Sequence, residues 1–323
     1  MLGYRLHPHH SGVLQLRRLV LACALLAALA GCRDTPADHL QRARDAVFEK
    51  RPDEALVEYR KAVDLLRRDD TPQSLVLRAR ALKGAADVYW LEQRKVKEAV
   101  SVYKELLVQC PESPEALEAR IILAELLRVH YNDLRGAIDQ LTAALQRNPP
   151  QGAELHYQVA KLYFELADYA QCELEATRLA ERFATSAYVD DALFLRAQAI
   201  QMMEGRRQEA SRAYADLRTR FPDSELAAHA TVEMGRLRAE AGENEKAIEL
   251  WVQALKSHPD PALVQDYISR ARRRIADTTP GSIGERAKAF DHAQAPPPSA
   301  RAPRTSVEAA GGTAEEASRD HGD

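Results

Sequence analysis

The sequence has few cysteines, few aromatic residues and no excess of charge of one sign. Only 4 of its 323 residues are cysteine and 6% are aromatic, while 45 lysines and arginines nearly balance 48 acidic residues. A protein that binds nucleic acid concentrates basic residues on one face. The near balance of basic and acidic residues in this sequence therefore does not favour nucleic-acid binding. The cysteines and histidines also lack the paired spacing of a metal site.

Motifs of enzyme active sites are missing as well. The sequence has no H-E-x-x-H, no phosphate-binding P-loop and no G-x-S-x-G. His130, His156, His229 and His258 are dispersed along the chain, so each is expected on the surface or in packing rather than as a metal ligand. We therefore expect no cofactor, no metal and no catalysis. An enzyme of envelope polysaccharide or peptidoglycan metabolism would need a further domain, for which the chain has no room.

The longest apolar run covers the twelve residues Leu19–Ala30, too short for a bilayer span of about 20 residues. Arginines precede it without acidic residues, and it ends in Leu29-Ala30-Gly31-Cys32. This stretch resembles the signal peptide and lipobox of bacterial lipoproteins. The resemblance implies cleavage of residues 1–31, diacylglycerol on the Cys32 thiol and a fatty acid on its new amine. An ordinary secretory signal with a chance cysteine is the alternative.

Arg33 follows Cys32, where an aspartate commonly retains such lipoproteins at the inner membrane. The resemblance therefore favours the outer membrane of a Gram-negative envelope, facing the periplasm. Loss of the signal removes three arginines and makes the formal net charge of −3 more negative. Of the cysteines, Cys110 and Cys172 then remain as thiols. They lie too far apart in the predicted repeats for a disulfide, and Cys172 is expected to be buried.

A repeat organises the residues between 38 and 276. Small residues recur at spacings of 44, 38, 35, 38 and 37: Ala55, Ala99, Ala137, Cys172, Ala210 and Ala247. Four residues after these anchors stand Tyr59, Tyr103, Leu141, Ala176, Tyr214 and Trp251, and twelve after four of them stand Pro111, Pro149, Pro222 and Pro259. Anchor and following residue share one face of a helix, so the aromatic residues are expected in the core.

The clearest unit runs from Gly235 to Pro259, with a Gly-Glu-Asn turn between two helical stretches. Its pattern resembles the tetratricopeptide repeat, a pair of helices that is stable only when stacked on its neighbours. The resemblance implies an all-α, TPR-like α-solenoid. We expect a linker at 32–37, six repeats and a final capping helix (Pro261–Ala276) within 38–276, and a disordered Pro/Ala-rich tail over 277–323.

Two junctions between repeats narrow the resemblance. Phe183 to Ser186 and Phe221 to Ser224 each follow one predicted helix and open the next. They resemble the "FP-x-S" junctions of envelope repeat proteins of the BamD and CpoB type, in which serine caps the next helix.

In such solenoids the first helix of each repeat lines a concave groove that binds partner proteins. Seven residues are expected near it: Trp90, Arg128, Tyr157, Lys161, Phe164, Gln198 and Arg236. Tyr157, Lys161 and Phe164 share one helix face, where two aromatic rings beside a cation could hold an extended peptide. Ordinary wall packing is the alternative.

Four arginines, Arg270 and Arg272 to Arg274, end the capping helix. They either complement the helix dipole or contact anionic lipid or a partner.

The function predicted from the sequence is that of a membrane-anchored, non-catalytic scaffold for an envelope complex, with outer-membrane protein assembly as one such process. An accessory role in motility, secretion or pilus assembly uses the same architecture and stays open.

Overall fold

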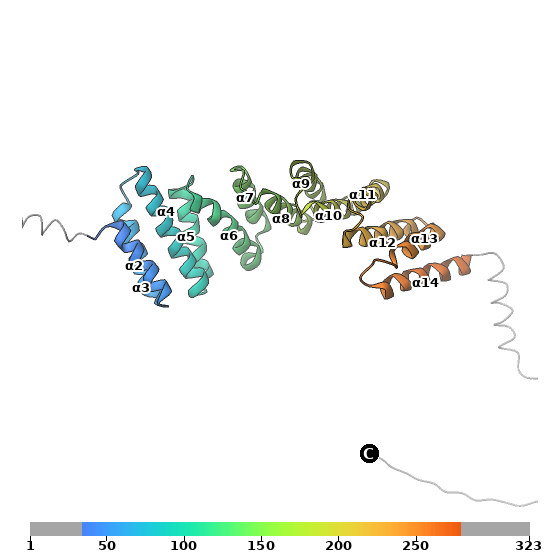
Figure 1. The fold of residues 1–323 in the computed structure, drawn as a ribbon, viewed down its shortest axis with the longest axis horizontal. Coiled ribbons are helices and arrows are strands. Elements are labelled where there is room, and N and C mark those ends of the chain that lie inside the picture. The colour runs from blue at the N-terminus through green and yellow to red at the C-terminus, as the bar shows by residue number, and fades with distance from the viewer. Residues whose placement is uncertain (1–33, 279–323) are drawn as a thin grey trace, which may run out of the picture.

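The computed structural model describes residues 34–278, which form a stack of helical hairpins (Figure 1). This range contains thirteen α-helices, one π-helix and no strand, which confirms the predicted all-α fold. The hairpins are α2 (Pro36–Phe48) with α3 (Pro52–Leu66), α4 (Pro72–Asp87) and the π-helix η1 (Val88–Glu92) with α5 (Val96–Gln109), α6 (Pro114–Tyr131) with α7 (Leu134–Leu145), α8 (Gly152–Glu165) with α9 (Tyr169–Arg182), α10 (Val189–Met202) with α11 (Arg207–Arg220), and α12 (Glu225–Glu240) with α13 (Asn244–Ala254).

A single helix, α14 (Pro261–Thr278), follows the last hairpin and ends two residues later than expected. The predicted lipoprotein signal, Cys32 and the tail from residue 279 lie outside the described residues. Among the helices of the described range, none combines the length and the apolar character that crossing a lipid bilayer requires.

Local sequence explains where many of the helices begin. The Thr35 hydroxyl accepts the N–H of Asp38, whose carboxylate accepts the N–H of Thr35 in return, which is a capping box. Proline occupies the first turn of α2, α3, α4 and α6, where its missing N–H leaves no bond unmade. In the turn before α13, Gly242 has a φ of +82°, which glycine adopts without strain.

The two serine junctions differ from each other. Ser224 caps α12 as expected, because its hydroxyl accepts the N–H of Leu226. The expectation for Ser186 is wrong. Its hydroxyl accepts the N–H of Tyr188, which lies in a turn before α10 begins at Val189.

The predicted repeat columns form the core. All six anchor residues are fully buried, and the residues four positions later are at most 6% exposed. The polar atoms of the large aromatic residues bond to the first helix of the same hairpin. Tyr103 donates to Asp87 (2.5 Å), Tyr214 to Gln201 (2.7 Å), and the Trp251 indole to the carbonyl oxygen of Val232 (3.0 Å). In these three hairpins the second helix, α5, α11 or α13, is thus fixed by both packing and a directed bond.

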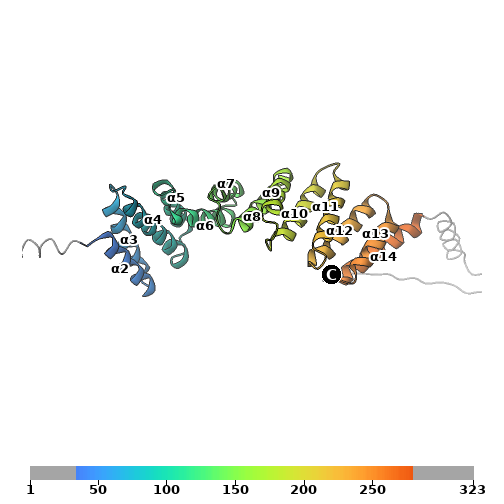
Figure 2. The same cartoon turned by 45° about the horizontal axis from the view of Figure 1, so that its top comes forward.

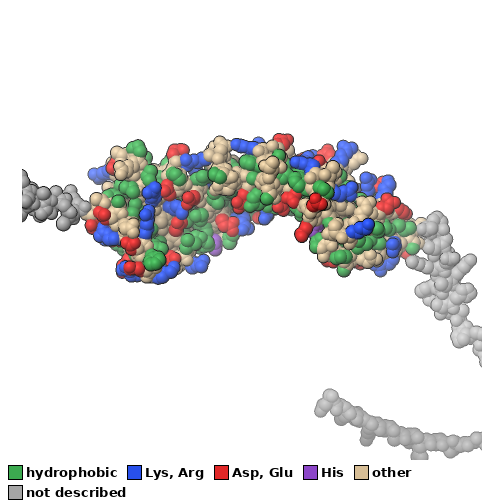
Figure 3. All heavy atoms as spheres, in the orientation of Figure 1, with side chains coloured by type: hydrophobic (Ala, Val, Ile, Leu, Met, Phe, Trp, Pro, Cys, Tyr) green, Lys and Arg blue, Asp and Glu red, His purple; other side chains and the backbone are tan. Residues whose placement is uncertain are grey.

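The hairpins follow one another in chain order along the long axis of an elongated, bowed stack (Figure 2 and Figure 3). The second helices α7, α9 and α11 run along the outer, upper edge in Figure 1, with α8 and α10 beneath them. Consistent with this, first helices contact each other across joints, as α8 does α10, whereas second helices make at most marginal contacts. The first helices therefore line the inner side of the bow.

Candidate binding groove on the inner side

The inner side opens at two of its six joints. First helices of neighbouring units come within 8 Å of each other, Cα to Cα, over several residues at the joints α2/α4, α4/α6, α8/α10 and α10/α12. The joints α6/α8 and α12/α14 lack such a contact. A hollow lies at each of these two joints, and each contains residues that the sequence places at the groove.

The hollow at the α6/α8 joint has a volume of about 210 Å³. Leu141 of the second helix α7 forms its floor, and the remaining lining residues are Ala124, Glu125 and Arg128 from α6, and Gln158, Lys161, Leu162 and Glu165 from α8. Arg128 pairs with Glu125 at 2.8 Å on the exposed rim. The structure thus brings the predicted residues Arg128 and Lys161 together around one hollow, with two cations balanced by two carboxylates.

Tyr157 and Phe164 do not line this hollow. The Nζ of Lys161 lies 5.6 Å from the centre of the Tyr157 ring, a cation–π contact, and that ring packs against Tyr188 at 5.8 Å. Burial, together with the charges of Asp191 and Asp190, raises the pKa of Tyr157 to about 12. Phe164 is half-buried at the margin of the core and packs edge-on against Tyr169 at 5.4 Å. Of the expected aromatic pair, only Tyr157 contacts the cation.

The hollow at the α12/α14 joint measures about 160 Å³ and contains the predicted Arg236. Trp251 of α13 forms its floor, Ala239 and Glu240 complete the α12 side, and α14 contributes Tyr267, Arg270, Ala271 and Arg274. The Tyr267 ring stacks on the Trp251 indole with centroids 5.5 Å apart. Two members of the basic run at the end of α14, the last helix of the described range, therefore line a recess of the inner side.

The remaining predicted residues lie elsewhere. Trp90 is on η1, half-buried, with its ring edge-on to His130 at 5.3 Å. Gln198 is half-buried on α10. Neither residue lines either hollow. Gln198 belongs to α10, whose joints with α8 and α12 are closed by contacts between first helices. Trp90 lies in a final turn that is π-helical, and this turn changes the direction of its side chain.

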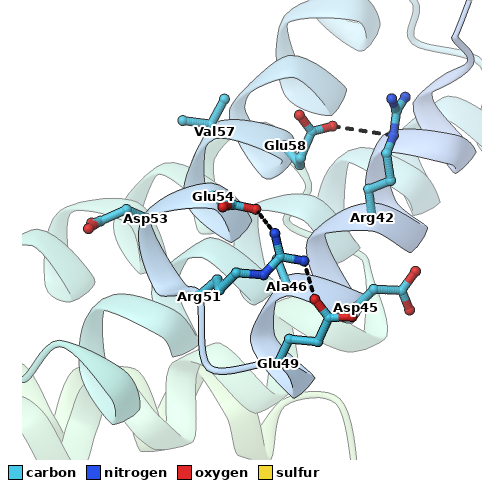
Figure 4. A pocket seen from close by; sticks show the side chains of 9 residues that line it. All are labelled: Arg42, Asp45, Ala46, Glu49, Arg51, Asp53, Glu54, Val57 and Glu58. Carbon is cyan, nitrogen blue, oxygen red and sulfur yellow. Dashed lines mark hydrogen bonds and ion pairs between the residues drawn. The ribbon is translucent and has the colours of Figure 1, made fainter.

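A third hollow, of about 560 Å³, was not anticipated from the sequence (Figure 4). It lies between α2 and α3, and all its lining residues come from these two helices and the turn that joins them. Arg51 reaches across it to Glu49 and Glu54, and the Nε of Arg42 lies 3.5 Å from Glu58. The sequence does not single out these residues, because they resemble the charged face of any exposed helix.

Histidine–glutamate contacts recur at one register. His39 bonds to Glu58 at 2.6 Å, and His156 bonds to Glu175 at 2.9 Å, each pair joining the two helices of a hairpin. Both pairs are 19 residues apart in sequence, and each glutamate follows its anchor by three residues. Burial opposes ionisation of Glu175, but the His156 bond and the Arg178 charge lower its pKa.

Two of the histidines that are dispersed along the sequence pack against each other in the structure. The Nε2 of His258 lies 3.1 Å from the Nδ1 of His229, with ring centroids 4.5 Å apart. An antiparallel hairpin places the start of α12 beside the end of α13, and this is where the two residues stand. Burial and the neighbouring His258 lower the pKa of His229. Within residues 34–278, no three His, Cys, Asp or Glu side chains are grouped to hold a metal ion.

Cys110 and Cys172 are free thiols and Cys172 is buried, both as predicted, and Cys110 is buried as well. Burial, with the nearby charges of Glu173 and Asp168, raises the pKa of Cys172 to about 12.

Residues 191–224, one hairpin of the stack, match the tetratricopeptide repeat family model. Solved structures share the fold. The C-terminal part of a TPR repeat-containing protein from Cytophaga hutchinsonii is 12% identical with a TM-score of 0.53, over 79% of this chain and 96% of that one. A structure of Naa15/Naa10 bound to HypK-THB is 17% identical with a TM-score of 0.51, over 80% and 36%.

A tetratricopeptide repeat protein from Parabacteroides merdae is 15% identical with a TM-score of 0.43, over 73% and 98%. No curated protein matches the sequence. The structure is thus a TPR-like solenoid, a fold that suggests a scaffold for protein–protein interactions. At these identities the solved structures establish the fold alone, and the narrower likeness to the BamD and CpoB type stays a prediction.

Proposed function

We propose that this protein is a non-catalytic scaffold that binds a partner protein along the inner side of its solenoid. The observation that carries the proposal is the hollow at the α6/α8 joint, where Arg128 and Lys161 converge above the apolar floor of Leu141. A recess with an apolar floor and a charged rim is the arrangement that protein interfaces use, with burial at the centre and polar residues around it. At about 210 Å³ it accepts a side chain of a longer chain rather than a whole small molecule.

Site-specific photo-crosslinking in cells tests this proposal. A photoreactive amino acid at Lys161, on the rim of the hollow, should yield a discrete adduct with one protein. The matched control is Lys104, an exposed lysine on the second helix α5. Equal adducts at both positions, or none at Lys161, would contradict the groove assignment.

The charged rim gives a second, independent measurement. Combining Arg128→Ala with Lys161→Ala removes both cations of the hollow without touching its floor. We expect capture of the crosslinked partner to fall about ten-fold, with unchanged helical circular dichroism, because two exposed charged contacts of about 0.7 kcal/mol each amount to one order of magnitude. Unchanged capture would remove Arg128 and Lys161 from the site.

We further propose that Cys32 is acylated and tethers the scaffold to the outer membrane, facing the periplasm. This proposal rests on the lipobox that ends in Gly31-Cys32 and on the residue after it, which is Arg33 where inner-membrane lipoproteins commonly have aspartate. Several acyl chains together anchor stably, whereas one does not. Labelled palmitate should be incorporated by the natural protein and lost in Cys32→Ser, and Arg33→Asp should move the protein to inner-membrane fractions. Unlabelled natural protein would refute the anchor.

The partner's identity distinguishes the two processes that this architecture serves. If the crosslinked protein is an outer-membrane protein assembly factor, the scaffold serves outer-membrane protein assembly. If it is a component of motility, secretion or pilus assembly, the scaffold is an accessory of that process.

A further inference from the structure

The two inner hollows are built in the same register but differ in charge. Lining residues on α8 follow the spacing Gln158, Lys161, Leu162, Glu165, and those on α14 follow the same spacing with Tyr267, Arg270, Ala271, Arg274. Both floors, Leu141 and Trp251, stand four residues after an anchor alanine. The same geometry therefore occurs twice along the groove.

At the α6/α8 joint the rim is neutral, with Glu125 and Glu165 opposite Arg128 and Lys161. At the α12/α14 joint, the position of Glu165 is taken by Arg274. The residues that line the second recess thus include Arg236, Arg270 and Arg274 but a single carboxylate, Glu240, while Glu233 and Asp266 pair with Arg236 and Arg270 from outside the lining. A recess with this excess of guanidinium groups favours an anionic group at its centre.

The internal ion pairs of two of these residues, Arg236 and Arg270, use only part of their donors. Both contacts of Arg236 with Glu233, each 3.0 Å, are made by Nη1, and the 2.6 Å contact of Arg270 with Asp266 is made by Nη2. A guanidinium has five N–H donors in a planar fork. Each arginine can therefore keep its internal partner and still donate to a carboxylate in the recess.

The floor and the volume of the α12/α14 recess restrict the kind of group that can occupy it. Trp251 and the stacked Tyr267 form an aromatic wall beside the arginines. With about 160 Å³, the recess is smaller than the roughly 300–1,000 Å³ of small-molecule sites. It suits one side chain of an extended polypeptide rather than a free metabolite.

From these observations we infer that the α12/α14 recess is a subsite for an acidic side chain, Asp or Glu, of the polypeptide bound along the groove. This inference rests on the proposed groove function and specifies the chemistry of the partner at one end. The recess lies between two first helices and is floored by a second helix, so it opens to the inner side of the bow. Arg272 and Arg273 are exposed on α14 but do not line the recess, and they are the arginines that a flat bilayer surface would meet instead.

Binding of a defined acidic peptide tests the inference. The probe is a fluorescein-labelled peptide with four consecutive glutamates, and its counterpart has four glutamines. Fluorescence anisotropy with the full chain in non-ionic detergent, at about 50 mM salt where charge is weakly screened, should show binding of the glutamate peptide only.

Charge-neutralising variants on the same helix supply matched controls. Arg270→Gln with Arg274→Gln removes two cations of the recess and should raise the Kd about ten-fold. Arg272→Gln with Arg273→Gln removes the same charge from other faces of α14 and should change the Kd less than two-fold. Equal weakening by both pairs would mean that only net charge matters, and it would overturn the subsite.

A soluble lipid competitor tests whether the recess binds an anionic lipid headgroup in place of an acidic side chain. Dihexanoyl-phosphatidylglycerol should displace the glutamate peptide far less effectively than the same peptide without its label. If the lipid competes equally well, the recess recognises a phosphate headgroup and the inference is wrong. Loss of peptide binding while the Lys161 crosslink persists would refute this subsite and leave the proposed function intact.

Discussion

The indole of Trp251 lies against the backbone of Gly235, so closely that a Cβ on Gly235 would stand 2.4 Å from the indole Nε1. The indole also donates to the carbonyl oxygen of Val232 at 3.0 Å and forms the floor of the α12/α14 recess. Gly84 approaches the Tyr59 ring in the same way, with a Cβ position 2.4 Å from Cζ. At both places glycine allows a first helix to contact an aromatic residue of a second helix.

Gly235→Ala should therefore destabilise the protein by about 1–3 kcal/mol through overpacking against Trp251. The sign of the change in unfolding free energy is informative, because the same substitution at a helix position without a close neighbour stabilises by about 1 kcal/mol. Urea denaturation followed by circular dichroism measures the difference, and Gly84→Ala serves as a parallel case. A gain in stability at Gly235 would show that the joint has room to spare.

The buried pair of His156 and Glu175 should make stability depend on acid. Since the folded state lowers the pKa of Glu175, its contribution is present at neutral pH, above the unfolded value of about 4.3, and is lost as pH falls through the folded pKa. Glu175→Gln should reduce the free energy of unfolding by about 1–3 kcal/mol at pH 7, because it replaces a buried charged acceptor.

The measurement is urea denaturation of both proteins at pH 7 and at acidic pH. Their difference should shrink as the medium becomes acidic. Arg178→Gln, which removes only the exposed partner of Glu175, should have a smaller effect at pH 7. A difference that is independent of pH would mean that Glu175 is not ionised in the folded protein.

Acidification should also loosen the contact between α12 and the segment before α14. The lowered pKa of His229 means that the unfolded chain binds the proton more readily, so stability falls as pH decreases from above the ordinary value of about 6.5. His258, Glu225 and Glu233 are the titratable groups that act on it. His229→Gln should flatten the dependence of Tm on pH between 7.5 and 5. An unchanged slope would exclude His229 as its origin.

The thiol of Cys172 should be inert in the native protein. With a pKa raised to about 12 and no exposed surface, it is protonated and inaccessible at pH 8. A disulfide reagent should label neither Cys172 nor the buried Cys110 until denaturant is added. A Cys172→Ala variant isolates Cys110 and identifies the slower thiol. Fast labelling of Cys172 without denaturant would contradict the packing at this anchor.

The core of this fold could be predicted from the sequence because its rule is local. Ala247 and Trp251 share a helix face by virtue of their spacing, and the same spacing returns at Ala99 and Tyr103. The hollows could not be found in this way. They depend on whether α6 meets α8 and whether α12 meets α14, which is set by the orientation of whole hairpins.

The same limit explains the individual misses. Nothing in the spacing of Phe164 distinguishes a groove residue from one that packs on Tyr169. His229 and His258 are 29 residues apart, and only the closed hairpin brings their rings together. Arg128 and Lys161 could be predicted as groove residues because long charged side chains on first helices remain accessible whichever way the joint turns.

Where α6 and α8, or α12 and α14, make no extended contact, the two helices are joined mainly through the intervening second helix, α7 or α13. A polypeptide that seats side chains in both recesses would touch both facing helices at each joint and act as a brace on the inner side. Its binding would then hold the curvature of the stack at these two points.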